Sequence, residues 1–164
     1  MKSLGRRRGR YQFQTSQEEL DLLSSILRLY PHSPHTGHAW NPSARNHSDS
    51  VDQALLLEAL EAQRLENKAA IDTLLNGKNR FRNTDHGIEF SLALPELEQL
   101  MQALNDVRVG SWYRLGCPTD HEDCEKKLNG SNVHLLVAME AAASFELALI
   151  NAFGSASSSI AESG

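Results

Sequence analysis

Six polar or charged side chains interrupt two segments whose apolar residues otherwise follow the spacing of core-facing helices. They are Arg64, Asn67, Lys68, Asn105, Asp106 and Arg108. Arg108 follows Leu104 by one helical turn, which directs it toward the core rather than squarely at water. Because buried charges survive only when paired and hydrogen-bonded, we expect Arg108 to bond to a carboxylate and Asn67 or Asn105 to bridge backbone groups. Such a network either holds the helices in register or forms the floor of a cleft for an anionic ligand.

Two further stretches carry side chains that can bind metal ions. Residues 31–49 contain four histidines, which are His32, His35, His38 and His47. Neutral imidazole suits zinc, nickel or copper. Thiolates and imidazoles of a second set, Cys117, His121, Cys124 and His134, could complete a tetrahedral zinc site. The cysteine spacing is not the usual Cys-x2-4-Cys pair, and the histidine stretch has no acidic orienting residue before Asp49. We expect no cofactor, and the alternative function is a metal-binding protein or metal-dependent hydrolase.

The N-terminal segment is basic, with five Lys or Arg among its first ten residues. We expect residues 1–9 to form a disordered arm. One interpretation of the arm is a hook for nucleic acid or an acidic partner. No aromatic side chains are interleaved with the arginines as a stacking platform, so a solvated tail is favoured and nucleic acid is not an expected partner.

The bulk properties limit the class of protein. A chain of 164 residues fits one domain with a real core. The net charge of −5 is mild, so the whole molecule is not built for nucleic acid or an anionic membrane. No apolar run approaches the roughly 18 residues that a membrane span needs, and two cysteines make no disulfide scaffold. We therefore expect a cytoplasmic protein without a membrane partner.

The apolar spacing predicts two short strands and four helices. Strands are expected where apolar and polar residues alternate, near residues 11–14 and 88–92. Helices are expected after the capping boxes at 15–19, from about 51 to 75, from 95 to 115, and from 131 to 153. These segments predict a single helical domain over residues 10–153, with a flexible His-rich loop at 31–49 and a disordered tail at 154–164.

An offset of 77 positions aligns the chain with itself. Tyr11 and Phe13 then fall on Ile88 and Phe90, and the apolar residues of the first helix fall on those of the third. The alignment predicts a strand–helix–helix unit repeated twice, with a possible antiparallel strand pair, although two amphipathic passages can also match by chance. The expected fold class is mainly α, a four-helix assembly with two short strands.

Three short motifs resemble a known family. They are Glu18-Glu19, Arg64-x3-Lys68, and Ala103-Leu-Asn-Asp-Val-Arg-Val109 with Arg114-Leu-Gly116. The chain is similar in them to a bacterial family of domains of unknown function, best represented in actinobacteria, with a Leu-Asn-Asp-x-Arg-Leu segment followed by Arg-Leu-Gly. Some members are encoded beside the adaptor of the Clp protease, which implies a regulatory role near proteolysis. The His-rich and cysteine loops are not part of the family pattern, and the last helix is alanine-rich rather than aromatic-rich.

No nucleophile–base pair or phosphate-binding loop is recognisable in the chain, and the last predicted helix has a broad apolar surface. We therefore expect a small regulatory or protein-interaction module of the bacterial cytoplasm and not an enzyme. Its partner would be another protein, still to be identified, and a homodimer is one form that such contacts could take.

Overall fold

The computed structural model describes residues 1–33, 47–77 and 80–161. Along the chain the elements are β1 (Lys2–Arg7), β2 (Arg10–Thr15), α1 (Gln17–Leu27), α2 (His47–Asn76), β3 (Arg82–Thr84), β4 (Gly87–Leu92), α3 (Leu94–Arg114), α4 (His121–Lys127) and α5 (Val133–Ala161).

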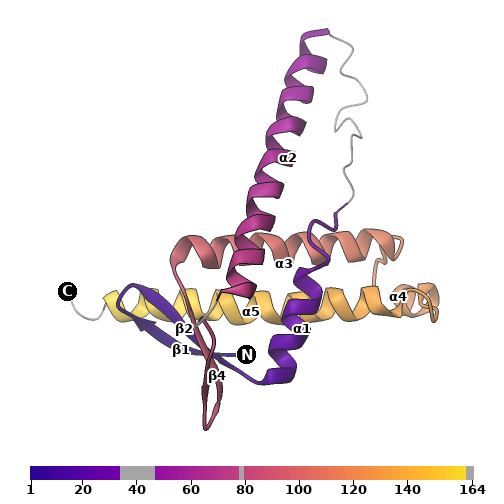
Figure 1. The fold of residues 1–164 in the computed structure, drawn as a ribbon. Helices are drawn as coiled ribbons and strands as arrows, with labels where there is room; N and C mark the ends of the chain where they lie inside the picture. The colour runs from indigo at the N-terminus through magenta and orange to yellow at the C-terminus, as the bar shows by residue number, and fades with distance from the viewer. Residues whose placement is uncertain (34–46, 78–79, 162–164) are drawn as a thin grey trace.

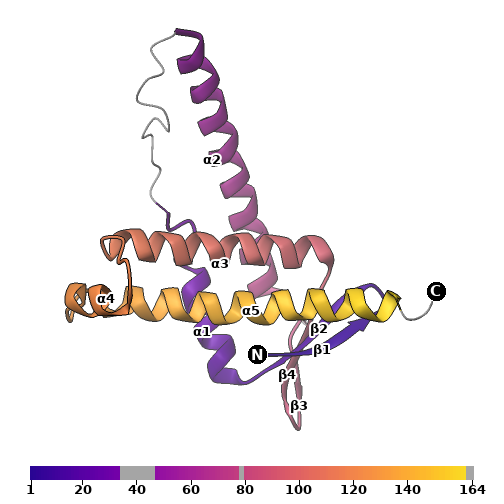
Figure 2. The same cartoon turned by 180° about the vertical axis from the view of Figure 1, so that it is seen from behind.

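The long helices α3 and α5 run antiparallel, side by side, and form one layer of the molecule (Figures 1 and 2). The helix α1, the lower half of α2 and the sheet all lie on one side of that layer. The opposite side of α5 is therefore left without a covering element (Figure 2). The upper half of α2 rises away from the body (Figure 1). Among the α2 side chains that the structure describes, from residue 54 onward, the buried ones are Asn67, Ile71 and Leu74 in the lower half.

The sheet has four antiparallel strands in the order β1-β2-β4-β3. At its centre Phe13 of β2 lies directly opposite Phe90 of β4, and their rings stack with centroids 5.4 Å apart. Alternate residues of both central strands point inward and are buried, as expected for a sheet covered on one face. The order is symmetric about the β2–β4 pair, and each hairpin leads into a helix.

Local signals explain where the first and third helices begin. The Ser16 hydroxyl accepts from the Glu19 amide while the Glu19 carboxylate accepts from the Ser16 amide, which is a complete capping box for α1. At the start of α3 the Glu96 carboxylate accepts from the Ala93 amide and also from Arg10 of β2. Glu96 thereby fixes the first turn of α3 to the sheet.

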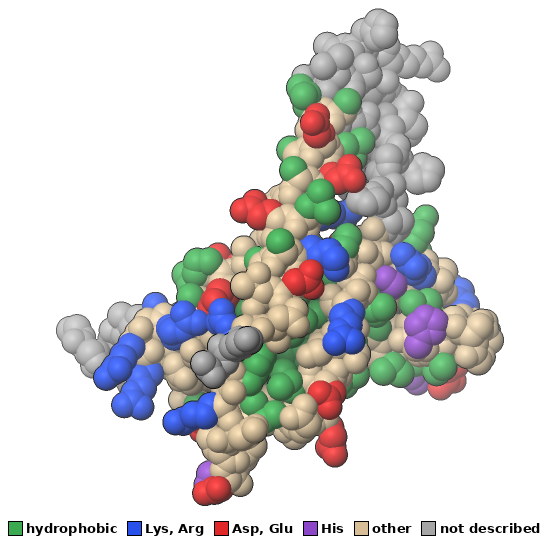
Figure 3. Space-filling model, viewed as in Figure 1, with side chains coloured by type: hydrophobic (Ala, Val, Ile, Leu, Met, Phe, Trp, Pro, Cys, Tyr) green, Lys and Arg blue, Asp and Glu red, His purple; other side chains and the backbone are tan. Residues whose placement is uncertain are grey.

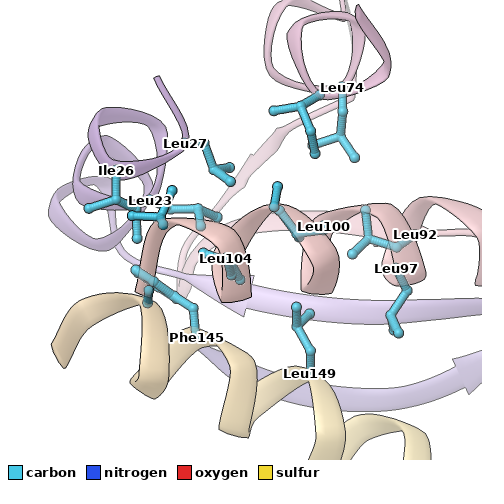
Figure 4. Close-up of a cluster of buried hydrophobic side chains, with 14 of the residues drawn as sticks. Leu23, Ile26, Leu27, Leu74, Leu92, Leu97, Leu100, Leu104, Phe145 and Leu149 are labelled. Carbon is cyan, nitrogen blue, oxygen red and sulfur yellow. The ribbon is translucent and has the colours of Figure 1, made fainter. Parts of the chain in front are cut away.

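The hydrophobic core lies between the two layers. Leucines of α1, β4 and α3 meet Phe145 and Leu149 of α5, and Leu74 closes the cluster from α2 (Figure 4). Small residues Ala138, Ala142 and Ala152 let α5 approach its neighbours closely.

The expected mainly α fold with four helices and two strands was wrong. The described residues form a mixed fold with five helices and a four-stranded antiparallel sheet. The expected disordered arm contains β1, because pairing with β2 uses backbone groups and needs no apolar side-chain pattern. The short strand β3 and helix α4 were also missed, and α5 continues to Ala161 within the expected tail. Most of the His-rich stretch lies outside the described residues.

Candidate functional site

Asp106 of α3 holds the chain that follows α1. Its Oδ1 accepts hydrogen bonds from the backbone amides of His32 at 2.6 Å and Ser33 at 3.0 Å. Its backbone carbonyl accepts from the Ser33 hydroxyl at 3.0 Å. The Asp106 side chain is only 11% exposed, so these bonds satisfy backbone donors that have little access to water.

Gly110 lies one turn after Asp106 and touches the same segment. A Cβ atom built at Gly110 would lie 2.5 Å from the His32 carbonyl carbon, so only glycine permits this approach. One turn further, the Arg114 guanidinium donates to the His32 carbonyl oxygen at 3.3 Å. Three residues at four-residue spacing on one face of α3 thus bind residues 32–33. We call this set, Asp106, Gly110 and Arg114, the clasp.

The helix α2 reaches the clasp from the other side. Arg64 Nη2 lies 3.4 Å from Asp106 Oδ2, and Lys68 Nζ donates to the Tyr30 carbonyl at 3.1 Å. The buried Asn67 donates to the Gln102 side chain of α3 at 2.9 Å. Burial raises the pKa of the Tyr30 phenol above its ordinary value. The polar side chains of α2 therefore bind the helix to α3 and to the end of the α1 segment.

A cleft of about 410 Å³ lies at this junction, between α2 and α3. Tyr30, Arg64, Asn67 and Asp106 line its polar part, and Leu60 and Val109 line its apolar part. The cation that could attract an anionic ligand is Arg64, which is already paired with Asp106. The cleft is consequently a neutral, mixed surface, and its polar groups act first on the chain's own backbone.

Arg108 belongs to a second cluster, between α3 and α5. Its Nε lies 3.0 Å from Glu146 Oε2, and its Nη2 donates to the Asn105 side chain at 2.7 Å. The Arg108 side chain is 43% exposed, whereas Glu146 is 15% exposed. Burial raises the pKa of the Glu146 carboxyl, and the guanidinium of Arg108 opposes this shift.

The six sequence-predicted residues thus fall into two sets. Arg64, Asn67, Lys68 and Asp106 gather at the α2–α3 junction, where Asn105 also lines the cleft, while Arg108 lies against Glu146 of α5. The hydrogen bonds described for Asn67 and Asn105 go to the side chains of Gln102 and Arg108, so their bridging of backbone groups stays a prediction. Asp106 takes that role. Sequence reasoning overlooked Gly110 and the position of Arg114, although their four-residue spacing from Asp106 was a readable signal.

The predicted zinc ligands do not gather. No group of three His, Cys, Asp or Glu side chains that could hold a metal ion occurs in the described part of the chain. His121 lies on the exposed side of α4 beside Glu125, at 3.2 Å. Cys124 is buried with Leu115 and Leu135, where it acts as a small apolar residue.

Of the histidine stretch, the structure describes the side chain of His32. It is buried against α3, and burial together with the nearby Arg114 lowers its pKa. His35 and His38 lie outside the described residues, as does the His47 side chain. A metal site at the four histidines therefore stays a prediction.

The uncovered side of α5 is a second candidate site. Five large apolar side chains of this helix are extensively exposed. They are Val133, Val137, Leu147, Ile150 and Phe153. We call this set the α5 face. Val133–Gly154 is also the one described segment that is long and apolar enough to cross a membrane, and 28% of its apolar stretch is buried in the fold. Only the length and the apolar composition of the segment favour a membrane span, and the core helix of a soluble protein can be equally long and apolar.

Comparison with known proteins returns no match among family models, curated proteins or solved structures. The resemblance of residues 103–116 to the actinobacterial family therefore stays a prediction.

Proposed function

We propose that this protein is a protein-interaction module rather than an enzyme, and that the first partner of its α5 face is a second copy of the chain. The observation that carries the proposal is the row of exposed apolar side chains along the outer side of α5. Leu147 alone is 58% exposed. Several large exposed apolar side chains on one helix mark an interaction site more often than a solvated one.

The middle of the α5 face suits a close helix crossing. Between the apolar residues at its two ends lie the small exposed residues Ala143 and Ser144. Two antiparallel copies of α5 that cross between these residues would bring their axes within the 8–10 Å of packed helices. Apolar positions then meet apolar positions, since position 137 comes to lie opposite position 150. A two-fold axis of this kind generates a closed dimer.

The charges near the crossing are compatible with the same arrangement. The described side chains of α5 include no Lys or Arg, and Glu140 interrupts its exposed row. In the two-fold crossing, position 140 lies opposite position 147 of the second copy. Arg108 pairs with Glu146 beside that position and is 43% exposed. We propose that the Glu140 carboxylate of each copy reaches toward this partly exposed guanidinium of the other copy.

Two substitutions on the α5 face and one control test the dimer. We expect the wild-type chain to sediment as a dimer, and Val137→Asp or Leu147→Asp to sediment as a monomer, because a carboxylate would be buried without a partner. Leu65→Asp is the control, because Leu65 is exposed on α2 and lies away from that helix's buried row. A monomeric wild-type chain, or a Leu147→Asp variant that stays dimeric, would contradict the proposal.

Flotation with phospholipid vesicles separates protein contacts from membrane insertion. We expect the wild-type chain to remain in the soluble fraction. Co-flotation that Leu147→Asp abolishes would mean that the α5 face meets lipid, and the interaction-module proposal would be wrong.

A regulatory role near Clp-type proteolysis in the bacterial cytoplasm is the finer form of the proposal. It rests on the resemblance of the segment containing Asp106 and Arg114. These residues bind the chain's own backbone. The resemblance therefore favours a fold shared with the family more directly than a binding partner shared with it. Binding between this chain and a purified Clp adaptor, measured by isothermal titration calorimetry, would support the link, and the absence of heat would remove it.

A further inference from the structure

The face of the sheet that points away from the helices is hollowed and rich in arginine. Inward-pointing Tyr11 and Phe13 are buried, so the alternate residues Arg10, Gln12 and Gln14 lie on the other face of β2. A concavity of about 600 Å³ crosses this face. It is lined by Leu4, Arg7, Arg8, Arg10, Gln12, Arg82 and Glu89, which come from all four strands and the β1–β2 turn.

The β1–β2 turn concentrates positive charge at one end of this concavity. Arg8 and Gly9 form a two-residue turn in which both have positive φ, 51° and 78°. The turn places Arg7 directly opposite Arg10 across the two strands. Like charges at a cross-strand pair are unfavourable, and a left-handed conformation is costly for a residue with a Cβ atom. A two-residue hairpin turn of this type itself requires positive φ at both positions. The pairing of like charges is therefore the arrangement that stability alone disfavours, and it points to a ligand for these side chains.

Acidic side chains neutralise only part of this charge. Arg10 and Arg80 both pair with Glu96, and Arg82 pairs with Glu89. For Arg7 and Arg8, no acidic partner occurs among the residues that the structure describes. Figure 3 shows the blue side chains of Lys and Arg gathered at the end of the molecule that the hairpin occupies. An otherwise mildly acidic chain thus carries one concentrated positive surface.

We propose that this concavity binds the phosphate backbone of a nucleic acid. The cations that line it are all arginines, whose planar guanidinium groups bind phosphate oxygens in pairs. They are distributed from the turn, at Arg7 and Arg8, across to Arg82 on β3, which suits a chain of successive phosphates better than one isolated anion. Gln12, between them, offers an amide that can bond to sugar or base.

The composition of the concavity also sets the kind of recognition. Its lining residues include no aromatic side chain, because Tyr11, Phe13 and Phe90 point into the core. Bases therefore have no stacking platform there, and binding is sequence-independent and strongly dependent on salt. This surface is distinct from the α5 face, so its use does not depend on dimer formation.

Fluorescence anisotropy with a labelled oligothymidine tests the proposal. The double variant Arg7→Gln with Arg8→Asn removes both unneutralised charges and keeps a turn sequence, Asn-Gly, that favours positive φ. The matched control is Arg28→Gln with Lys126→Gln, which removes two exposed charges away from the sheet, one at the C-cap of α1 and one on α4. We expect the double variant to bind about tenfold more weakly at moderate salt and the control to bind like wild type.

The salt dependence and two competitors complete the test. Loss of two phosphate contacts should reduce the slope of log affinity against log salt by about 1.4. Unlabelled oligothymidine or a DNA duplex should displace the probe, whereas an equally charged polyglutamate should displace it poorly. Equal loss of affinity in variant and control, or equal displacement by polyglutamate, would overturn the proposal.

Discussion

Replacing Asp106 tests the role assigned to the clasp. In Asp106→Ala the backbone amides of His32 and Ser33 lose their acceptor, and Arg64 loses its ion pair with this carboxylate. A buried donor left without an acceptor costs about 1–3 kcal/mol. Because the segment at 32–33 can relax toward water, we expect a total loss of about 3 kcal/mol in the free energy of unfolding.

Asp106→Asn separates the two contributions of the carboxylate. The asparagine oxygen can still accept from both amides, but its attraction to Arg64 is lost, so we expect a cost of about 1 kcal/mol. Urea unfolding gives both values, provided that the slope of free energy against urea stays unchanged. In thermal unfolding, the alanine variant should melt roughly 6–12 °C lower, since 1 kcal/mol corresponds to about 2–4 °C in a domain of this size.

An exposed carboxylate on the same helix provides the control. Glu98→Gln should change the free energy of unfolding by less than about 0.5 kcal/mol. An Asp106→Ala variant as stable as this control would refute the reasoning, because the two backbone amides would then be satisfied without the carboxylate. Equal destabilisation by alanine and asparagine would instead show that the charge, and not the oxygen acceptor, supplies the stability.

Three further variants test neighbouring contacts. Gly110→Ala forces a methyl group against the His32 carbonyl and should cost about 1–3 kcal/mol in urea unfolding, so an unchanged midpoint would contradict the close approach. Arg108→Met should cost about 1–2 kcal/mol, less than the roughly 3–5 kcal/mol of a fully buried pair, because the guanidinium is 43% exposed. The pKa of His32 is lowered in the folded chain, so the unfolded chain takes up a proton first as pH falls below about 6.5. Stability should therefore decrease from pH 7 toward pH 5.5, and His32→Gln should remove part of that decrease in unfolding curves measured across this range.

Much of the local structure was readable from the sequence. The alternation at Phe13 and Phe90 predicts strands that the structure contains, and the Ser16–Glu19 capping box marks the start of α1. The charges on α2 and α3 were recognised as candidates for pairing. These features depend on residues within a few positions of one another, where spacing alone decides which side chains share a face.

Other elements lacked such a signal. The strand β1 exposes most of its side chains and is held by backbone pairing with β2, so no apolar alternation marks it. The seven-residue helix α4 buries only Cys124 and begins at the capping Asp120 within an acidic loop. Both elements owe their place to neighbours rather than to an apolar pattern of their own.

The sequence by itself determined where most helices and the two central strands lie, and it showed that Asp106 and Arg108 interrupt an apolar stripe. Only the tertiary structure decided their partners. Asp106 meets His32, which is 74 positions earlier in the chain, and Arg108 meets Glu146 of α5. The physical reason is that helical and strand periods are local, whereas a hydrogen bond or ion pair between distant segments forms only after the layers have packed.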